Sequence, residues 1–503
     1  MSEPAPARVE PSLDPTDWDG VRATFRAAVD LALDHVQHIR DKPVWTPTPV
    51  PVKLALHEAA PRQSQALGGL LTRFVRDILP HATGNLHPRF FGWVHGGGNI
   101  AGALGEMLAA FINCNLGGRD HVGVYVERQV LDWCKEIFGF PATSSGLLTS
   151  GTSMASVIAL AAARSAQAGA DVRRLGMAGL PKRLVGYASS EAHVSVAKAF
   201  ELLGFGRDAL RSVAVDQYFR LSLGDLARQV AQDRAEGLAP SIVVASAGTV
   251  NTGAIDDLAA IAAFCREQRL WLHIDAAFGG FAALLPAFRI PLAAMAEADS
   301  IAFDFHKWLQ VPYDAGGVLV KDEAAHRGAF STRRDYLAPA QRGLAGGEPW
   351  FCEYGPELSR GFRALKVWFT VKAHGLDRLA QVIQRNCEQA QRLGRLVRAR
   401  RDLELLAPVG LNIVCFRVVA PGLADGALDR LNQDIVAELQ LRGIAVPSTT
   451  RLGGKTAIRV ALTNHRTTAA DIDILVDAVH GTAKELLAAR EDGAAPRVAA
   501  MRR

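Results

Sequence analysis

The stretch DFHKWLQVPYDAGG, residues 304–317, begins at the end of the apolar run SIAFDF, residues 300–305. That run is short and rich in β-branched and aromatic residues, as is typical of a strand buried on both faces of a sheet. Lys307 therefore stands just past a predicted strand, beside His306 and Trp308. A lone lysine there is usually a surface residue in a turn. At the end of a parallel strand, however, a lysine shielded from water can lose its proton and attack a carbonyl.

Similar apolar runs alternate with helical stretches upstream of Lys307. The predicted strands are LVGYAS (184–189), SIVVASA (241–247) and LWLHID (270–275). The predicted helices are SMASVIALAAARSAQ (153–167), HVSVAKAFELLG (193–204) and DDLAAIAAFCREQ (256–268). This alternation predicts an α/β fold with a mostly parallel sheet that carries helices on both sides.

The pattern changes after the helical segment ALKVWFTVKAHG, residues 364–375. A long charged helix, roughly Leu376–Arg401, is followed by the strand candidates NIVCFRVV (412–419), GIAVPSTT (443–450) and AIRVALT (457–463). We therefore expect an N-terminal tail and helical segment (1–86), a large domain (87–375), a small α+β domain (376–490) and a flexible tail (491–503). The loop at 337–350 is rich in Gly, Pro and Ala, and loops of that length are usually functional or disordered.

Composition excludes several classes of function. The 503 residues carry a net charge of only +5, and their basic residues are scattered, which argues against nucleic-acid binding. No run of about 18 apolar residues predicts a membrane span, and MSEPAPARVEPSLDP at the start is not typical of a signal peptide. The six cysteines form no CxxC pair, which favours a reducing compartment, and we expect the cytoplasm.

Three further groups follow strands of the predicted sheet. Asp275 ends LWLHID and is followed by small residues; it could cap a helix, or it could pair with a pyridinium nitrogen. Residues 149–153 (TSGTS) occupy a strand-to-helix turn, where N–H groups and hydroxyls can bind an anion or simply cap the helix. His193 follows LVGYAS; it could be structural, or it could stack on a flat cofactor. Together with Lys307 they supply the groups that are needed to bind a phosphorylated pyridine aldehyde.

Four motifs carry a resemblance to a known family. They are EAHVSV (191–196), HIDAAFGG (273–280), DFHKWLQVPYDAGG (304–317) and ELSRGFRALKVWF (357–369). In this order they resemble the group II decarboxylases that depend on pyridoxal phosphate (PLP), which include the aromatic-L-amino-acid, glutamate and cysteine-sulfinate decarboxylases. The similarity runs from about His87 to about Thr468. The HKW element with the upstream DAA is its most specific part.

The resemblance implies a fold and a cofactor. The expected architecture is the aspartate-aminotransferase-like PLP-dependent fold, assembled as a homodimer whose active sites are shared between subunits. Lys307 would hold PLP as a Schiff base, Asp275 would pair with the pyridine nitrogen and His193 would stack on the ring. The remaining cofactor contacts would be Thr152, Ser153 and His306 at the phosphate, and Ser246 and Ala277 along the ring.

The resemblance also implies residues that act on the substrate. Tyr336 matches the tyrosine of a mobile catalytic loop that is thought to protonate the carbanion after CO2 leaves. Arg360 matches an arginine that faces the substrate carboxylate. Trp93, near Phe90 and Phe91, suggests an aromatic substrate, although aromatic side chains at such positions are also ordinary core residues.

The chain departs from the family pattern in two places. Many relatives carry Asn-Pro or Asp-Pro before the His-Lys pair, whereas this chain has Asp304-Phe305. An anionic Asp304 would repel a phosphate, so we assign it no phosphate contact. Gly96 is the first of three consecutive glycines and stands where aromatic decarboxylases tend to carry a polar residue. The resemblance therefore does not define the residues at the substrate end of the pocket.

The predicted function is decarboxylation of an L-amino acid, with an aromatic one preferred, to an amine and CO2. The absence of a clear basic cluster for a second carboxylate disfavours glutamate and aspartate. The alternatives are an acidic or aliphatic substrate, or aldehyde-forming or aminotransferase chemistry on the same scaffold. A cofactor-binding protein without catalysis is disfavoured because every catalytic position is filled.

Overall fold

The computed structural model describes residues 12–169, 171–331 and 340–491. The chain divides into two compact units at Gly84 and Asn85. The first contains α1 (Trp18–Gln37), α2 (Val50–Ala55) and α3 (Leu67–Arg73). Asp17 begins α1 by accepting the backbone N–H of Gly20. In this unit α3 packs against α1.

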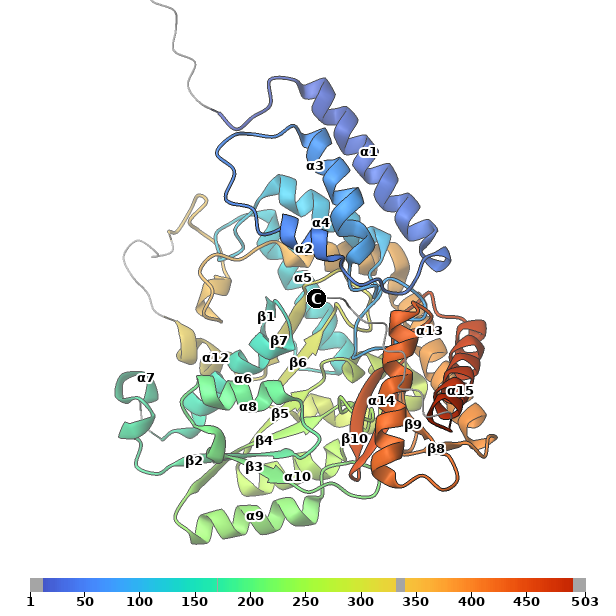
Figure 1. Ribbon diagram of the computed structural model, residues 1–503. Coiled ribbons are helices and arrows are strands. Elements are labelled where there is room, and N and C mark those ends of the chain that lie inside the picture. Colours follow the sequence, from blue (N-terminus) through green and yellow to red (C-terminus); the bar gives the residue numbers. More distant parts are fainter. Residues whose placement is uncertain (1–11, 170, 332–339, 492–503) are drawn as a thin grey trace, which may run out of the picture. The chain divides into compact units, whose positions relative to one another are not determined.

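The second unit is built on a seven-stranded sheet (Figure 1). Its spatial order is β1, β7, β6, β5, β4, β2, β3. The bounds are β1 Ser145–Thr149, β2 Leu184–Ser189, β3 Leu210–Val213, β4 Ala239–Ser246, β5 Trp271–Asp275, β6 Ser300–Asp304 and β7 Gly316–Val320. The strands from β3 to β6 pair in parallel, whereas β7 runs antiparallel to both β1 and β6. The side chains at one edge of this sheet therefore come from consecutive strand–helix units.

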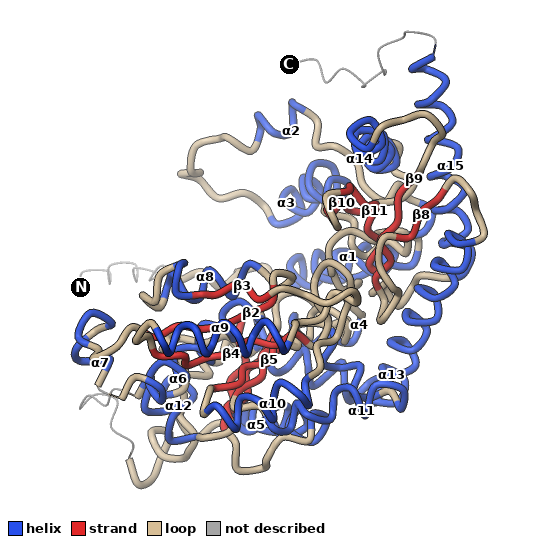
Figure 2. The backbone as a smooth tube through the Cα atoms, turned by 90° about the horizontal axis from the view of Figure 1, so that it is seen from below, coloured by secondary structure: helices blue, strands red, loops and turns tan. Residues whose placement is uncertain are grey.

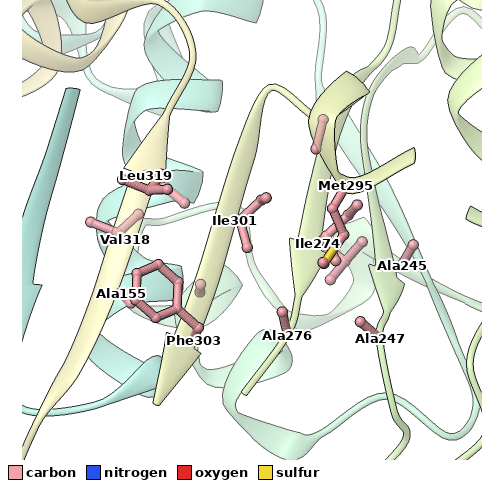
Figure 3. Packing of buried hydrophobic residues seen from close by; sticks show 14 of the residues in the cluster. Ala155, Ala245, Ala247, Ile274, Ala276, Met295, Ile301, Phe303, Val318 and Leu319 are labelled. Atoms are coloured by element: carbon pink, nitrogen blue, oxygen red, sulfur yellow. The ribbon is translucent and has the colours of Figure 1, made fainter. Parts of the chain in front are cut away.

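Helices pack around this sheet. Their bounds are α4 Ile100–Ile112, α5 Val122–Phe138, α6 Thr152–Gln167, α7 Val172–Leu175, α8 Val194–Leu202, α9 Leu223–Ala235, α10 Leu258–Gln268, α11 Arg289–Leu292, α12 Glu323–Phe330 and α13 Arg363–Arg398. Helix α6 contacts the central strands, and α8 and α12 pack against it. Five of the nine buried residues of α6 are alanine, and these small side chains let the helix approach the sheet closely. Figure 3 shows Ala155 of α6 beside Phe303 of β6, in the core of this layer.

A second, smaller sheet follows α13. It contains β8 (Leu403–Leu405), β9 (Ile413–Val418), β10 (Ser448–Leu452) and β11 (Lys455–Ala461), all antiparallel. Figure 2 shows α14 (Asp425–Leu441) and α15 (Ala469–Glu491) beside it. These elements bury their own hydrophobic cluster. Together the two sheets confirm the predicted fold class, a large mostly parallel sheet followed by a small α+β part.

The boundaries of some elements differ from the prediction. The strand expected at 443–450 begins only at Ser448. Gly443 follows the end of α14 with a φ of 64°, and Val446 instead forms an isolated parallel bridge with Phe90. The helical run around 364–401 is one element, α13, which is interrupted at Gly375 by a φ of 71° and a ψ of 154°. In the described part of the chain, no helix is long and apolar enough to cross a membrane.

The turn after β6 is held by segments from both ends of the second unit. The Gln310 side chain accepts the N–H of Gly97 at 2.9 Å and donates to the carbonyl oxygen of Thr463 at 2.6 Å. The indole of Trp308 donates to the Asn386 side chain at 3.0 Å. Gln310 and Trp308 are buried, so these bonds are shielded from water. They fix the turn in which Lys307 directly precedes Trp308.

Gly96 packs directly against the same turn. A Cβ at this position would lie 2.3 Å from the carbonyl oxygen of His306 and 2.4 Å from that of Lys307. Both contacts are to backbone, which cannot move aside as a flexible side chain can. The family resemblance suggested a polar residue at position 96, but in this chain only glycine lets the two segments meet.

We expect Gly96→Ala to lower the free energy of unfolding by about 1–3 kcal/mol, because the added methyl group overpacks a rigid contact. Equilibrium unfolding in urea measures the change. Gly361→Ala is the matched control, since a Cβ at 361 meets nothing within 4 Å. Equal stability of the Gly96→Ala variant and the wild type would contradict this, because it would show that the turn can shift to accommodate the methyl group.

Candidate active site

Lys307 lies at the carboxyl end of β6, in contact with Asp304 at the end of the same strand. The Lys307 Nζ is 2.8 Å from Asp304 Oδ2, and the His306 Nε2 is 3.6 Å from the same oxygen. Burial raises the pKa of Asp304, but the charges of Lys307 and His306 outweigh burial, so the net pKa lies below its ordinary value. Asp304 is therefore an anion that pairs with the Lys307 ammonium.

The N-terminus of α6 faces this ion pair. The backbone N–H of Thr152 donates to Asp304 Oδ1 at 2.7 Å. The Thr152 hydroxyl is buried and has no hydrogen-bond partner among the described residues. A buried hydroxyl without a partner is costly, and a helix N-terminus favours a negative group. Because α6 begins here, a phosphate at this position would satisfy both.

Asp275 is buried at the end of β5, the strand next to β6. Its Oδ1 accepts the backbone N–H of Ala277 at 3.0 Å. Burial raises the pKa of Asp275, and the Lys307 ammonium opposes that change. A buried carboxylate of this kind is stabilised by a positive partner, as a protonated ring nitrogen would be.

His193 begins α8, where its ring serves as the N-cap. The Nδ1 accepts the backbone N–H of Ser195 at 3.2 Å and lies 2.7 Å from the Ser195 hydroxyl. This leaves the proton of a neutral ring on Nε2. Burial lowers the pKa of His193, which favours the neutral form, although Asp275 acts in the opposite direction.

These groups line one pocket of about 350 Å³. This volume is within the range of small-molecule sites. The pocket brings together most of the predicted cofactor residues, namely Thr152, Ser153, His193, Asp275, Ala277, His306 and Lys307. They come from the ends of β2, β5 and β6 and from the start of α6, which is why distant motifs meet here.

Of the predicted residues that the structure describes, three do not line this pocket, namely Ser246, Trp93 and Arg360. Ser246 pairs with Asp275 across the β4–β5 register but is buried beside the pocket. Trp93 is half exposed and stacks on the His95 ring at 5.7 Å between centroids. Tyr336 lies outside the described residues.

The structure contradicts the prediction for Arg360. Its side chain is 1% exposed and forms an ion pair with Glu127 at 2.5 Å. It also donates to the backbone carbonyl oxygens of Leu116 and Leu148. All these partners lie in the interior of the large sheet layer, so the guanidinium holds the segment before α13 in place and does not face the pocket.

Tyr313 and Asp304 are among the lining residues to which sequence reasoning assigned no role. Tyr313 stacks on the His306 ring with 4.3 Å between centroids, and it lies in the quoted motif without being assigned a role. Asp304 was set aside because of its charge, yet the structure places it between Lys307 and Thr152. The sequence did contain a signal for this ion pair, since Lys307 follows Asp304 by only three residues.

The arrangement fits a phosphorylated pyridine. A phosphate could bind at Thr152, Ser153 and the N-terminus of α6, and a ring could extend toward Asp275 with His193 beside it. Lys307 supplies an amine for a carbonyl carbon. In the described chain no group of three or more His, Cys, Asp or Glu side chains could hold a metal ion.

Comparison with known proteins agrees with this geometry. Residues 49–419 match the model of a family described as the pyridoxal-dependent decarboxylase conserved domain. Aromatic-L-amino-acid decarboxylase from Bacillus atrophaeus is 32% identical over 91% of this chain and 94% of its own length. L-2,4-diaminobutyrate decarboxylase from Rhizobium meliloti is also 32% identical, over 85% of this chain and 84% of its own. The crystal structure of Oryza sativa TDC with PLP and tryptamine has a TM-score of 0.87 at 25% identity, covering 94% of this chain and 100% of that one.

We expect Asp304→Asn to bind PLP more tightly than the wild type does, by on the order of tenfold (~1.4 kcal/mol), because a negative charge beside the phosphate is removed. Fluorescence titration of the cofactor-free protein measures the dissociation constant. Pyridoxal, which lacks the phosphate, separates the two consequences of the substitution. Freeing Lys307 from its ion pair would change the affinity for both ligands, whereas removing the repulsion of the phosphate would change the affinity for PLP alone.

The matched control is Asp299→Asn, which removes a carboxylate just before the other end of β6. That variant should bind both ligands as the wild type does. An equal gain in affinity for PLP and pyridoxal in Asp304→Asn would show that Asp304 acts only on Lys307. A loss of PLP affinity would contradict the electrostatic account altogether.

Proposed function

Because the chain belongs to the family of pyridoxal-dependent decarboxylases, and is therefore a PLP-dependent amino-acid decarboxylase, we propose that its substrates are aromatic L-amino acids. The observation that carries the proposal is a series of rings that leads away from the pocket. Tyr313 lines the pocket and contacts His95 edge-on at 5.8 Å, and His95 stacks on Trp93 and on Phe90. Aromatic side chains pack well against such rings.

The charge of the pocket supports the same substrate class. Among the residues that the structure describes, Lys307 is the only lysine or arginine that lines it. Arg360 is occupied by Glu127 and by backbone carbonyls. The pocket thus offers no second cation for an acidic side chain, which disfavours glutamate and aspartate as substrates.

The residues of the chain divide the work of the reaction. PLP, when bound, supplies a positively charged ring that accepts the electrons of the bond broken at Cα. Asp275 would hold the proton on the ring nitrogen, which keeps that charge in place. His193 would cover the ring from the start of α8, and Thr152 with the N-terminus of α6 would anchor the phosphate. Lys307 would hold the cofactor before the substrate amine replaces it.

We assign the proton that Cα receives to Tyr336, by resemblance to the catalytic-loop tyrosine of the family. Its presence favours an amine product over an aldehyde. Without its hydroxyl this residue could not protonate Cα; O2 would instead take up two electrons and become hydrogen peroxide, and water would then release aldehyde and ammonia in place of the amine. Aldehyde formation in the wild type is therefore the second candidate function, and the product identifies which one operates.

We further propose that the protein is a homodimer whose active sites are shared between subunits, and that it is located in the cytoplasm. Helix α4 exposes the apolar side chains of Ile100, Leu104, Phe111 and Ile112, and neighbouring exposed apolar residues of this kind support an interaction surface. All six cysteines are free thiols, which supports a reducing compartment.

The test is a product assay over the twenty amino acids, with DOPA and 5-hydroxytryptophan added. We expect CO2 and the amine from aromatic substrates, at a kcat/KM at least about tenfold above that for glutamate or 2,4-diaminobutyrate, a difference of ~1.4 kcal/mol. Tyr336→Phe should still bind PLP but should shift its product toward aldehyde. Tyr218→Phe, an exposed tyrosine outside the pocket, is the control.

A preference for 2,4-diaminobutyrate or an acidic amino acid would contradict the aromatic assignment and leave the family unaffected. Aldehyde as the main wild-type product would favour the second candidate function. An unchanged ratio of amine to aldehyde in Tyr336→Phe would remove Tyr336 as the proton donor.

A further inference from the structure

A second cavity lies behind the Lys307 turn, apart from the pocket described above. It has a volume of about 490 Å³. One side is formed by α13 just after its interruption at Gly375, and the other by residues 99–100 and 465–466. Gln310, which holds the Lys307 turn, also borders it. The mechanism proposed above makes no use of this cavity.

The cavity is lined by cationic side chains. Arg378, Arg385 and Arg466 border it together with His374 and His465, and no Asp or Glu of the described chain is among the lining residues. Burial lowers the pKa of Arg466 to about 10, so it remains charged at neutral pH. Three guanidinium groups around one hollow repel one another unless an anion lies between them.

Some of these groups are already positioned by the fold. Arg466 donates to the carbonyl oxygen of Gly97 at 2.7 Å, and Arg385 donates to that of His465. The guanidinium of Arg378 forms no ion pair with a described carboxylate. A guanidinium has five N–H donors, so Arg378 and Arg385 can supply several of them to a ligand.

One polar side chain at the cavity lacks a partner, since the Nε2 of His374 is buried and has no hydrogen-bond partner in the described chain. The backbone at Gly375 is non-helical, so a new helical segment starts after it and continues to Arg398. Residues Arg378, Leu379 and Val382 of that segment line the cavity. A helix start of this kind carries partial positive charge.

We propose that this cavity is a binding site for a small phosphate-bearing metabolite. Guanidinium groups bind phosphate through paired hydrogen bonds, and the start of a helix adds backbone donors. Leu379 and Val382 add apolar lining beside the cations. The volume exceeds what an inorganic phosphate fills, so the ligand is a phosphate ester whose carbon portion lies against that lining.

The site is connected to the active site through Gln310. The backbone carbonyl of Gln310 accepts the Asn99 side chain at 2.8 Å, and its amide contacts the carbonyl oxygens of Lys307 and Trp308. Asn99 and Gln310 both border the cavity. A bound ligand therefore restrains the turn that carries Lys307, whatever amino acid is the substrate.

Calorimetry on the PLP-loaded enzyme in a phosphate-free buffer tests the binding. Glycerol 3-phosphate should bind once per subunit, inorganic phosphate more weakly, and glycerol not at all. Arg378→Gln and Arg385→Gln should each weaken glycerol 3-phosphate binding tenfold or more. Arg430→Gln, an exposed arginine of α14 that does not line the cavity, should leave it unchanged.

Absence of binding at millimolar glycerol 3-phosphate would overturn the proposal, as would binding that persists in both cavity variants. Tighter binding of citrate than of either phosphate would overturn the phosphate class. Hydrogen exchange then tests the connection: saturation should slow the backbone amides of residues 305–311 in the wild type and not in Arg378→Gln. Unchanged exchange in the saturated wild type would overturn the coupling to the Lys307 turn.

Discussion

The fold depends on one constraint: the turn after β6 must present Lys307 at the sheet edge where β5 ends in Asp275 and α6 begins at Thr152. Parallel pairing of β5 with β6 places two of these groups side by side, and the α6 N-terminus comes to the same edge because Thr152 follows β1. Asp304 joins them by accepting the Thr152 N–H and pairing with the Lys307 ammonium. The turn itself is held from behind by Gln310 and Trp308.

The two carboxylates of the site differ because of their surroundings. Both are buried, yet burial dominates at Asp275 and raises its pKa, whereas the charges of Lys307 and His306 dominate at Asp304 and lower its pKa. Among the described residues Asp275 forms no ion pair, so it could accept a pyridinium as its positive partner. Asp304 already has its partner, and it competes with a phosphate for the first N–H of α6. On the proposed binding of PLP, Asp275 would bind the ring and Asp304 would moderate how tightly the phosphate is held.

Much of this could be predicted from the sequence, for identifiable reasons. Buried parallel strands such as LVGYAS are continuous apolar runs, and β2 occupies those same residues. Motifs at strand ends identify the lining residues, because parallel strands bring their carboxyl ends to one edge. Contacts between distant segments were not predictable. The packing of Gly96 on the Lys307 turn and the ion pair between Arg360 and Glu127 depend on tertiary packing, which leaves no periodic signal. Arg360 was misassigned because a charged residue in a family motif suggests a ligand, although it can equally be a buried structural cation.

The most direct test of the account is reductive trapping of the cofactor. The PLP-loaded enzyme is treated with borohydride and digested, and mass spectrometry locates the phosphopyridoxyl group. The account predicts modification of Lys307 alone, and no trapped cofactor in Lys307→Ala. Lys366 is the informative comparison, because it is more buried than Lys307, pairs with Glu106 at 3.0 Å and does not line the pocket. Modification of Lys366 or another lysine, or none in an enzyme saturated with PLP, would contradict the central claim that the Lys307 turn is what the fold is built to present.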